Sequence, residues 1–405
     1  MILKETLRTI IQIQRMNNAA AETGVERELR EEIDINLPFA LVLSGIRRCG
    51  KSTLLQQVMK EAKQYYYFNF EDPRGTGFES SDFQKLDEIF NEEYGSQNHY
   101  FFDEIQNIDK WELGVRYLLE QKKHVILTGS NASLLSKELG TRLTGRHLRF
   151  ELFPFSYSEF LLFLKEKPMI RSFDEYLQKG GFPEFLKTNK SEVLQELLND
   201  LIARDIVVRH KIRSAKTIRE MAIFLLTNVG KEFSYTSLKK TFKLGSVNSA
   251  ISFVSYLEDS YLLFTISKFD YSLKKQAVNP KKIYSIDNGL SNANSGSFSL
   301  DSGRMLENAV FLHLRRKHRD IYYFKQKNEC DFVIKEKEKG TKAIQVCWEL
   351  TEDNKERELS GLTEAIESLK LKNGLIITHN QEDIIKVQNK TIHIKPAWKW
   401  MAEKN

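Results

Sequence analysis

The sequence predicts an α/β protein in which a parallel sheet is followed by a helical segment, a helix–turn–helix module and a second α/β domain. Apolar, strand-like runs alternate with helix-like patterns from about residue 38 to 150, which favours a parallel sheet covered by helices. From about residue 280 strands and helices mix again. The chain has 405 residues, 41% hydrophobic and 29% charged, which is enough for two to three globular domains.

The beginning of the chain predicts an amphipathic helix and not a secretory signal. The segment MILKETLRTIIQIQRM carries Glu5 and Arg8 within its apolar pattern. The longest apolar runs of the chain are far shorter than a membrane span, so we expect no membrane contact.

The three cysteines and the net charge give an indication of the cellular compartment and of the partners of the protein. Cys49, Cys330 and Cys347 have neither metal-ligand spacing nor the density of a disulfide framework, which favours a reducing cytoplasm. The formal net charge is +6, which is compatible with nucleic-acid binding without demonstrating it.

A glycine-bounded loop follows the first predicted strand at 41–43. Residues 45–52 read GIRRCGKS, which is the pattern G-x-x-x-x-G-K-[ST] of a Walker A motif or P-loop. The glycines let the backbone amides point into one concavity, and the following helix adds its positive N-terminal end. The pattern predicts a nucleotide site in which Lys51 reaches the β- and γ-phosphates and Ser52 ligates Mg²⁺. The expected contact set is Gly45, Ile46, Arg47, Arg48, Cys49, Gly50, Lys51, Ser52 and Thr53.

One residue of this loop carries a separate prediction. Cys49 stands beside Arg47, Arg48 and Lys51 near a helix N-terminus, so we expect its thiolate to be favoured. Oxidation of Cys49 would then block the phosphate site, unless it is an ordinary loop residue.

A second strand ends in carboxylates. The apolar residues 100–102 precede Asp103 and Glu104. In a P-loop enzyme Asp103 would hold Mg²⁺ through water, and Glu104 would orient and deprotonate the attacking water.

A third strand, at 125–127, leads into polar residues. Ser130 and Asn131 could contact the γ-phosphate or the attacking water, and they are equally suited to capping the next helix. Arg142 and Arg146 follow in a polar loop. An arginine there could neutralise charge on the γ-phosphate, in cis or from a neighbouring subunit, or the loop is simply solvated and basic.

Residues 161–217 read as mostly helical, with a break at 180–183. The stretch 200–220 has an excess of basic residues. They are Arg204, Arg209, Lys211, Arg213, Lys216 and Arg219.

A winged helix is predicted next. Ser234 could cap a helix through Phe242, Gly245 makes a turn, a second helix covers 248–259, and 261–266 forms a wing strand. The second helix places Ile251, Val254 and Leu257 on one face. Because it contains no Lys or Arg, DNA contact and protein packing both stay open as its role.

The C-terminal third has the outline of a metal-dependent PD-(D/E)xK nuclease. The helix GRMLENAVFLHLRR carries Glu307 and an apolar stripe, and a strand carries Asp331. The glutamate and lysine of the E-x-K element are replaced by Gln345 and Cys347. Gln345 brings no negative charge to a hard cation and Cys347 no ammonium group, so we expect a vestigial site. Lys342 is the remaining candidate for a migrated lysine.

These motifs together give the chain a family resemblance. It resembles prokaryotic AAA-type ATPases in which a winged helix and a DUF4143 domain of restriction-endonuclease-like fold follow the P-loop domain. The resemblance rests on SGIRRCGKSTLL, FFDEIQNI, LTGSNASLLS, LTGRHLRFELFPFSYSEF, GGFPEF, KKIYSIDNGL, LENAVFLHLRR and ECDFVI. It makes Arg146 in LTGR the preferred arginine. Many members look like candidate nucleases with an intact E-x-K, from which this chain departs at Gln345 and Cys347.

The resemblance also implies boundaries. An AAA-type ATPase domain with its N-terminal helix would cover 1–160, a helical lid or linker 161–212, the winged helix 213–272 and the degraded nuclease-like domain 273–405.

The expected function is Mg²⁺-dependent ATP binding and hydrolysis coupled to recognition of DNA or a protein partner. DNA would bind basic surfaces of the middle and C-terminal domains, and the protein partner could be another copy of the chain. No Asn-Lys-x-Asp guanine reader is visible, which favours ATP over GTP. The alternatives are a nucleotide-gated DNA nuclease and a regulatory switch that binds ATP tightly with little turnover.

Overall fold

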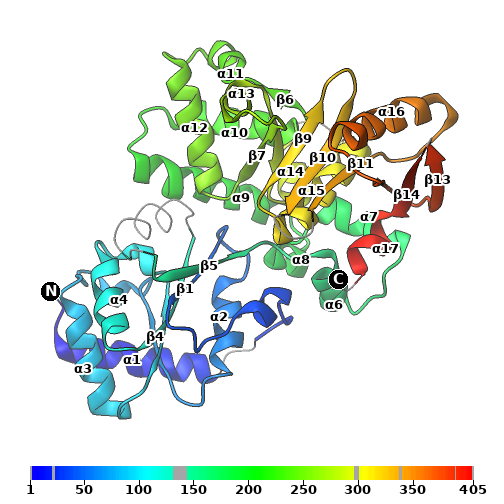
Figure 1. Cartoon of the computed structure of the whole chain (residues 1–405). Coiled ribbons are helices and arrows are strands. Elements are labelled where there is room, and N and C mark those ends of the chain that lie inside the picture. Colours follow the sequence, from blue (N-terminus) through cyan, green and yellow to red (C-terminus); the bar gives the residue numbers. More distant parts are fainter. Residues whose placement is uncertain are drawn as a thin grey trace. The chain divides into compact units, whose positions relative to one another are not determined.

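The computed structural model describes residues 2–20, 23–130, 143, 145–295, 301–336, 340–387 and 389–403 (Figure 1). The chain forms two compact units. Unit 1 comprises Met1–Phe153 and Asp259–Tyr261, and unit 2 comprises Pro154–Glu258 and Leu262–Asn405.

Unit 1 is built on a five-stranded sheet in the order β2-β3-β4-β1-β5, and every neighbouring pair is parallel. The predicted strands are the three central ones, and β2 and β5 add the two edges. The strands are β1 Ala40–Gly45, β2 Tyr66–Asn69, β3 His99–Asp103, β4 His124–Gly129 and β5 His147–Leu152. Because all run the same way, the residues that follow β1, β3 and β4 share one edge of the sheet.

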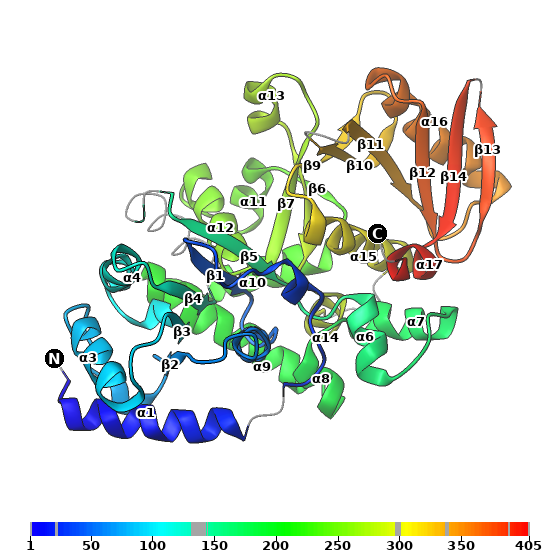
Figure 2. The same cartoon turned by 60° about the horizontal axis from the view of Figure 1, so that its bottom comes forward.

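The helices of unit 1 cover this sheet (Figure 2). The amphipathic N-terminal helix is confirmed as α1 Lys4–Ala19, which buries Leu7, Ile10, Ile11 and Gln14 and packs beside α3. The other helices are α2 Lys51–Met59, α3 Asp82–Tyr94 and α4 Trp111–Glu120, with 3₁₀ turns at Glu28–Glu32, Pro73–Gly75 and Ile105–Asn107.

Unit 2 begins with helices. They are α6 Tyr157–Leu164, α7 Ile170–Lys179, α8 Pro183–Thr188, α9 Glu192–Asp200, the π-helix Leu201–Val208 and α10 Ala215–Thr227. The predicted break falls between α7 and α8. Gly180 has φ +68°, and a Cβ there would meet the Asp287 carboxylate at 2.2 Å, so glycine is required.

The helix–turn–helix pattern forms α11 Tyr235–Thr241 and α12 Val247–Asp259. Ser234 caps α11 as expected, by accepting a hydrogen bond from the backbone N–H of Ser237. Of the three residues predicted to share one face of α12, Val254 and Leu257 are buried. Ile251 is 42% exposed, and Ala250 takes its place beside Val254 and Leu257.

A nine-stranded sheet occupies the rest of unit 2, in the order β13-β14-β12-β11-β10-β9-β7-β8-β6. The strands are β6 Glu232–Phe233, β7 Leu263–Lys268, β8 Lys281–Ser285, β9 Ile321–Lys325, β10 Glu329–Glu336, β11 Gly340–Val346, β12 Asn373–Thr378, β13 Asp383–Val387 and β14 Lys390–Pro396. The accompanying helices are α13 Leu273–Val278, α14 Asn288–Asn294, α15 Ser302–Lys317, α16 Glu352–Ser368 and α17 Ala397–Ala402.

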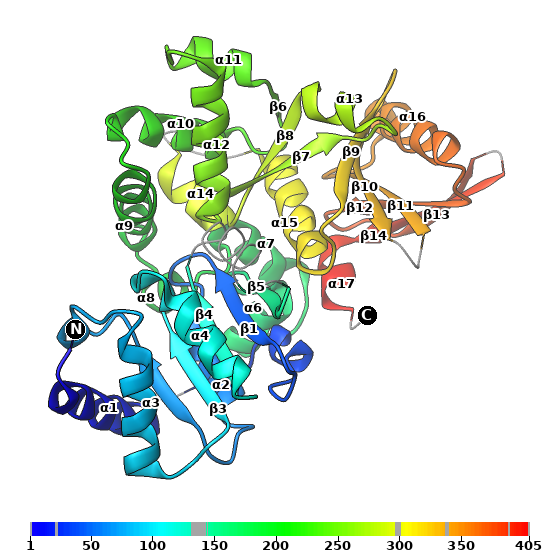
Figure 3. The same ribbon diagram turned by 60° about the vertical axis from the view of Figure 1, so that its left-hand side comes forward.

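The nine-stranded sheet continues across residue 272, which is the predicted boundary between the winged helix and the nuclease-like domain. β7 pairs antiparallel with β8 and parallel with β9, so it lies between them (Figure 3). The strand expected as a wing at 261–266 is thus β7, an inner strand of the larger sheet.

Candidate functional site

The P-loop connects β1 to α2 and depends on two glycines. A Cβ at Gly45 would lie 2.2 Å from the carbonyl oxygen of Leu152, so no larger residue fits. Gly50 precedes the first residue of α2 with φ +98°, a left-handed conformation that glycine adopts without strain. The loop therefore ends with backbone amides and a helix N-terminus that face the same space, which is an anion-binding geometry.

Lys51 supplies a buried positive charge to this loop. Its side chain is 3% exposed, and the ammonium group donates a hydrogen bond to the carbonyl oxygen of Ile46 at 3.2 Å. Its Nζ also lies 3.8 Å from Oε1 of Glu104. The loop carbonyl and the carboxylate hold the lysine where a phosphate oxygen could take over the interaction.

Asp103 is a buried carboxylate at the end of β3, only 2% exposed. Burial raises the pKa of Asp103, and the neighbouring charge of Glu104 raises it further. The hydroxyls of Thr128 and Ser52 donate hydrogen bonds to it, which favours the ionised form. Asp103 and Ser52 thus place anionic and hydroxyl oxygens together, a donor set that fits Mg²⁺.

Thr128, which the sequence analysis did not select, connects both acidic residues. Its hydroxyl donates to Asp103 and accepts a hydrogen bond from the backbone N–H of Glu104 at 2.9 Å. The residue stood within the polar end of the third strand, so the signal was present in the sequence.

Glu104 has a left-handed backbone, with φ +53°. Its carboxylate accepts a hydrogen bond from the side-chain amide of Gln106, which also lies 3.3 Å from the hydroxyl of Ser130. The structure therefore brings together Lys51, Ser52, Asp103, Glu104 and Ser130. Gln106 is a further residue that sequence reasoning missed.

A buried arginine, Arg27, forms hydrogen bonds with backbone carbonyls in and near the P-loop. It is 2% exposed, and its guanidinium donates to the carbonyl oxygens of Cys49 at 2.8 Å and Phe153 at 2.7 Å. No motif in the sequence marks it. Arg47 forms an ion pair with Glu71 at 2.6 Å.

The structure places Arg146 far from the P-loop of its own chain. Its carbonyl oxygen accepts a hydrogen bond from the backbone N–H of Ala40, at the amino end of β1, whereas the P-loop follows the carboxyl end. Five residues of strand separate the two ends by about 16 Å, which one side chain does not bridge. Arg146 could therefore serve a nucleotide only in a neighbouring subunit. Asn131 and Arg142 lie outside the described residues.

The expectation of a reactive Cys49 is wrong. The thiol is fully buried and lies 3.5 Å from the carbonyl oxygen of Leu152. Burial raises the pKa of Cys49, which outweighs the lowering effect of Lys51 and Arg27. Cys49 is a packing residue behind the loop.

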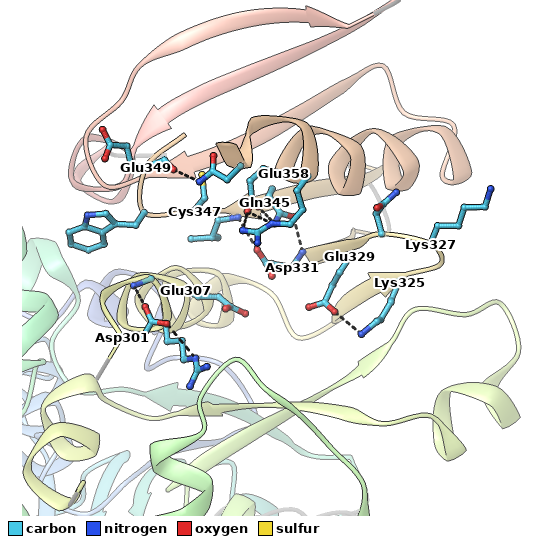
Figure 4. Close-up of a pocket in the computed structure, with 17 residues that line it drawn as sticks. Asp301, Glu307, Lys325, Lys327, Glu329, Asp331, Gln345, Cys347, Glu349 and Glu358 are labelled. Atoms are coloured by element: carbon cyan, nitrogen blue, oxygen red, sulfur yellow. Dashed lines mark hydrogen bonds and ion pairs between the residues drawn. The ribbon is translucent and has the colours of Figure 1, made fainter. Parts of the chain in front are cut away.

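A second site, in unit 2, is a pocket of about 650 Å³ lined by the predicted nuclease residues. Glu307 comes from α15, Asp331 from β10 and Gln345 from β11, and Cys347 follows β11 (Figure 4). The helix, the strands and the apolar stripe of α15, with Leu306, Val310 and Leu314 buried, agree with the sequence analysis.

A buried ammonium group beside these carboxylates comes from Lys282 on β8. Its Nζ lies 3.0 Å from Oδ1 of Asp331, 3.3 Å from Oε1 of Glu307 and 2.7 Å from Oε1 of Glu329. These four residues are called the Lys282 cluster below. The predicted migrated lysine, Lys342, is instead exposed on β11 and does not line the pocket.

Gln345 and Cys347, which replace the glutamate and the lysine of E-x-K, make other interactions. The side-chain amide of Gln345 donates to Glu358 at 2.7 Å, and its oxygen accepts the backbone N–H of Asp331 at 3.2 Å. Burial and the charge of Glu358 raise the pKa of Cys347 to about 12, so its thiol is neutral at physiological pH. Gln345 lacks the negative charge of the glutamate it replaces, and Cys347 lacks the ammonium group of the lysine.

Across the described residues, no helix combines the length and apolar character needed to cross a membrane.

Three family profiles match consecutive parts of the chain. Residues 38–161 match an AAA domain, residues 170–301 a domain of unknown function (DUF8612), and residues 302–400 another domain of unknown function (DUF4143). The Lys282 cluster draws on both of the last two segments, because β8 lies in one and α15 and β10 in the other.

Two curated proteins are similar over most of their length. The uncharacterized protein MJ1544 of Methanocaldococcus jannaschii is 36% identical over 393 residues, which covers 89% of this chain and 87% of MJ1544. An uncharacterized protein of Haemophilus influenzae is 29% identical over 341 residues, covering 78% of this chain and 84% of that protein.

Among solved structures, the Walker-type ATPase PABY2304 of Pyrococcus abyssi aligns with 67% of this chain and 95% of its own, at 17% identity and a TM-score of 0.43. DnaA from Aquifex aeolicus, bound to AMPPCP, aligns with 57% of this chain and 86% of its own, at 15% identity and a TM-score of 0.27.

Proposed function

The chain belongs to the family of AAA-domain P-loop proteins that end in a DUF4143 domain, and from this premise we propose that it binds ATP with Mg²⁺ and hydrolyses it. We propose further that the bound nucleotide controls recognition of DNA or a protein partner by unit 2. The observation that carries the ATPase proposal is the gathering of Lys51, Ser52, Asp103 and Glu104 at one edge of the parallel sheet.

The residues divide the work of phosphoryl transfer. The P-loop amides and the ammonium group of Lys51 bind the phosphates and neutralise the charge that develops on the γ-phosphate. Ser52 and Asp103 would hold Mg²⁺, which when bound screens the phosphate charge. Glu104 orients the attacking water and accepts its proton.

In the structure, both reactive side chains make hydrogen bonds within the chain. Lys51 donates to the carbonyl oxygen of Ile46, and Glu104 accepts from Gln106. ATP would release Lys51 from the carbonyl, because a phosphate oxygen is the stronger acceptor. This exchange would link the presence of nucleotide to the position of the loop.

Phosphate release and nucleotide binding, measured on two variants, test the ATPase proposal. Lys51→Ala should lose ATP binding and turnover together, whereas Glu104→Gln should bind ATP and lose turnover. Lys60→Ala and Glu120→Gln are matched controls, because both residues are exposed at helix ends away from the P-loop. Equal rates in wild type and both site variants would contradict the proposal.

Turnover separates an ATPase from a switch that binds ATP tightly. A switch would retain nucleotide through purification and hydrolyse it at a rate that Glu104→Gln leaves unchanged.

The position of Arg146 calls for a second measurement, the dependence of turnover on protein concentration. If this arginine acts in a neighbouring subunit, turnover per chain should rise with protein concentration, and Arg146→Ala should remove that rise.

The Glu104→Gln variant also tests the proposed control of recognition, because it should trap the ATP-bound form. Exposed basic side chains such as Arg204 and Lys216, 65% and 86% exposed, support a DNA ligand. Fluorescence anisotropy with labelled duplex should then show ATP-dependent binding that weakens steeply as salt is raised. No binding at low salt would leave a protein partner as the remaining form of this proposal.

A further inference from the structure

The Lys282 cluster places an ammonium group among three carboxylates at the position where the nuclease outline calls for a metal ion. We infer that Lys282 takes the place of the divalent cation beside Glu307 and Asp331, so that this site takes up no metal ion. The inference concerns unit 2 and does not depend on ATP hydrolysis.

The contacts of Lys282 are those of a central cation. Its side chain is 3% exposed and comes within 3.3 Å of one oxygen from each of Asp331, Glu307 and Glu329. These carboxylates reach it from α15 and from β10, while Lys282 itself lies on β8. Three segments distant in the sequence thus converge on one positive charge, as they would on a bound metal.

The charges agree with the geometry. Burial alone would lower the pKa of Lys282, but the carboxylates of Asp331, Glu307 and Glu329, together with Tyr284, raise it well above its ordinary value. Lys282 is therefore charged at any physiological pH. A divalent ion beside it would meet strong repulsion at low dielectric, and removing the ammonium alone would leave buried carboxylates unpaired.

Other contacts also engage oxygens at this site. Oδ2 of Asp331 accepts the backbone N–H of Val346 at 3.0 Å. Oε1 of Glu307, which faces Lys282, also accepts from the hydroxyl of Tyr284 at 2.7 Å. Oε1 of Gln345 accepts the backbone N–H of Asp331. Magnesium requires several free oxygen ligands in near-octahedral geometry, so this donor set does not fit it.

Figure 4 shows how acidic and basic side chains are distributed along the pocket. The carboxylates of Glu307 and Asp331 lie between α15 and the sheet, while Lys325 and Lys327 lie farther along the same pocket. Lys325 is itself paired with Glu329 at 3.0 Å. Lys282 and Lys325 thus both pair with carboxylates of this pocket.

Manganese binding by the full-length, nucleotide-free chain tests the inference, with Mn²⁺ followed by electron paramagnetic resonance. Lys282→Met keeps most of the length of the side chain and removes its charge. It should gain one Mn²⁺ site, bound at least about tenfold more tightly than any Mn²⁺ held by wild type in this pocket, because a charge this close shifts the pKa of a carboxyl group by about 1–3 units and should affect cation binding comparably. The double variant Lys282→Met/Asp331→Asn should lose the gained site.

The matched control is Lys281→Met on the same strand, since Lys281 donates to Ser267 and lies outside the cluster. A folded Lys282→Met that gains no site would overturn the inference. If Lys282→Met does not fold, wild type decides: a Mn²⁺ site that Asp331→Asn removes would also overturn it, and the same Mn²⁺ binding in wild type and Asp331→Asn would support it.

Discussion

The side-chain amide of Gln106 donates a hydrogen bond to the carboxylate of Glu104, two residues earlier in the chain, and lies 3.3 Å from the hydroxyl of Ser130. The proposed catalytic base is therefore held from the side by a residue of the turn that follows it. The left-handed backbone of Glu104 makes this short-range contact feasible, because it turns the chain sharply after β3.

Gln106→Ala should lower kcat for ATP about three- to tenfold and leave KM nearly unchanged, because Glu104 loses the group that orients it while the phosphate contacts stay. Steady-state phosphate release measures both constants. Gln106→Glu should be more severe, since a second carboxylate would repel Glu104. A larger change in KM than in kcat would argue against a positioning role.

Thr128→Val removes a hydroxyl and keeps the shape of the side chain. The backbone N–H of Glu104 would lose its acceptor and Asp103 would lose a donor, so unit 1 should lose about 1–3 kcal/mol of unfolding free energy. Urea unfolding of wild type and variant measures the loss. Thr128→Ser, which retains the hydroxyl, should stay close to wild type.

Arg27→Ala should loosen the P-loop. The guanidinium bonds to the carbonyl oxygens of Cys49 and Phe153 would both be lost, at a cost of about 3 kcal/mol in stability, and ATP should bind about tenfold more weakly. Thermal unfolding and titration with ATP check the two effects. Arg30→Ala serves as the control, because Arg30 pairs on the surface with Glu26. Unchanged ATP affinity in Arg27→Ala would mean that the loop does not depend on this arginine.

The raised pKa of Asp287 predicts that the stability of unit 2 depends on pH. Asp287 is buried and accepts hydrogen bonds from the backbone N–H groups of Gly181 and Leu290, yet burial raises its pKa from an ordinary 3.8 to about 6. The folded form therefore keeps a proton between about pH 4 and 6 that the unfolded chain has released. The stability that Asp287 contributes is greatest below this window and falls as pH rises through it.

The comparison with Asp287→Asn isolates this effect, because asparagine does not titrate. Relative to wild type, the variant should gain about 2–3 kcal/mol of unfolding free energy between pH 4.5 and 7. Thermal unfolding at a series of pH values measures it. A difference that stays constant with pH would show that Asp287 does not titrate in this range.

The positions of the P-loop and of the acidic strand end could be predicted from the sequence, because each depends on a short motif. The spacing of Gly45, Gly50 and Lys51 fixes the loop, and the end of a parallel strand places Asp103 at the same edge. The direction of the strands also explains why Arg146 does not reach the P-loop of its own chain. It precedes β5 and so lies at the amino end of the sheet, where nearness in sequence to the third strand is no guide.

The pocket of unit 2 could be predicted only in part. Glu307 and Asp331 follow from a known order of helix and strand, but Lys282 is 49 residues from Asp331 and reaches it only because β7 links β8 to β9. Cys49 illustrates a different limit. Its charged sequence neighbours suggested a reactive thiol, whereas burial, which depends on tertiary packing, decided the opposite.

The place of β7 between β8 and β9 limits how the chain can be divided. A fragment starting at residue 273 would retain every acidic group of the pocket. It would lose β7, which joins β8, the strand of Lys282, to β9. Cutting or recombining the gene there would open the sheet in its middle, with two unpaired strand edges prone to aggregation. A fragment that keeps the sheet around this pocket closed therefore has to begin upstream of β7.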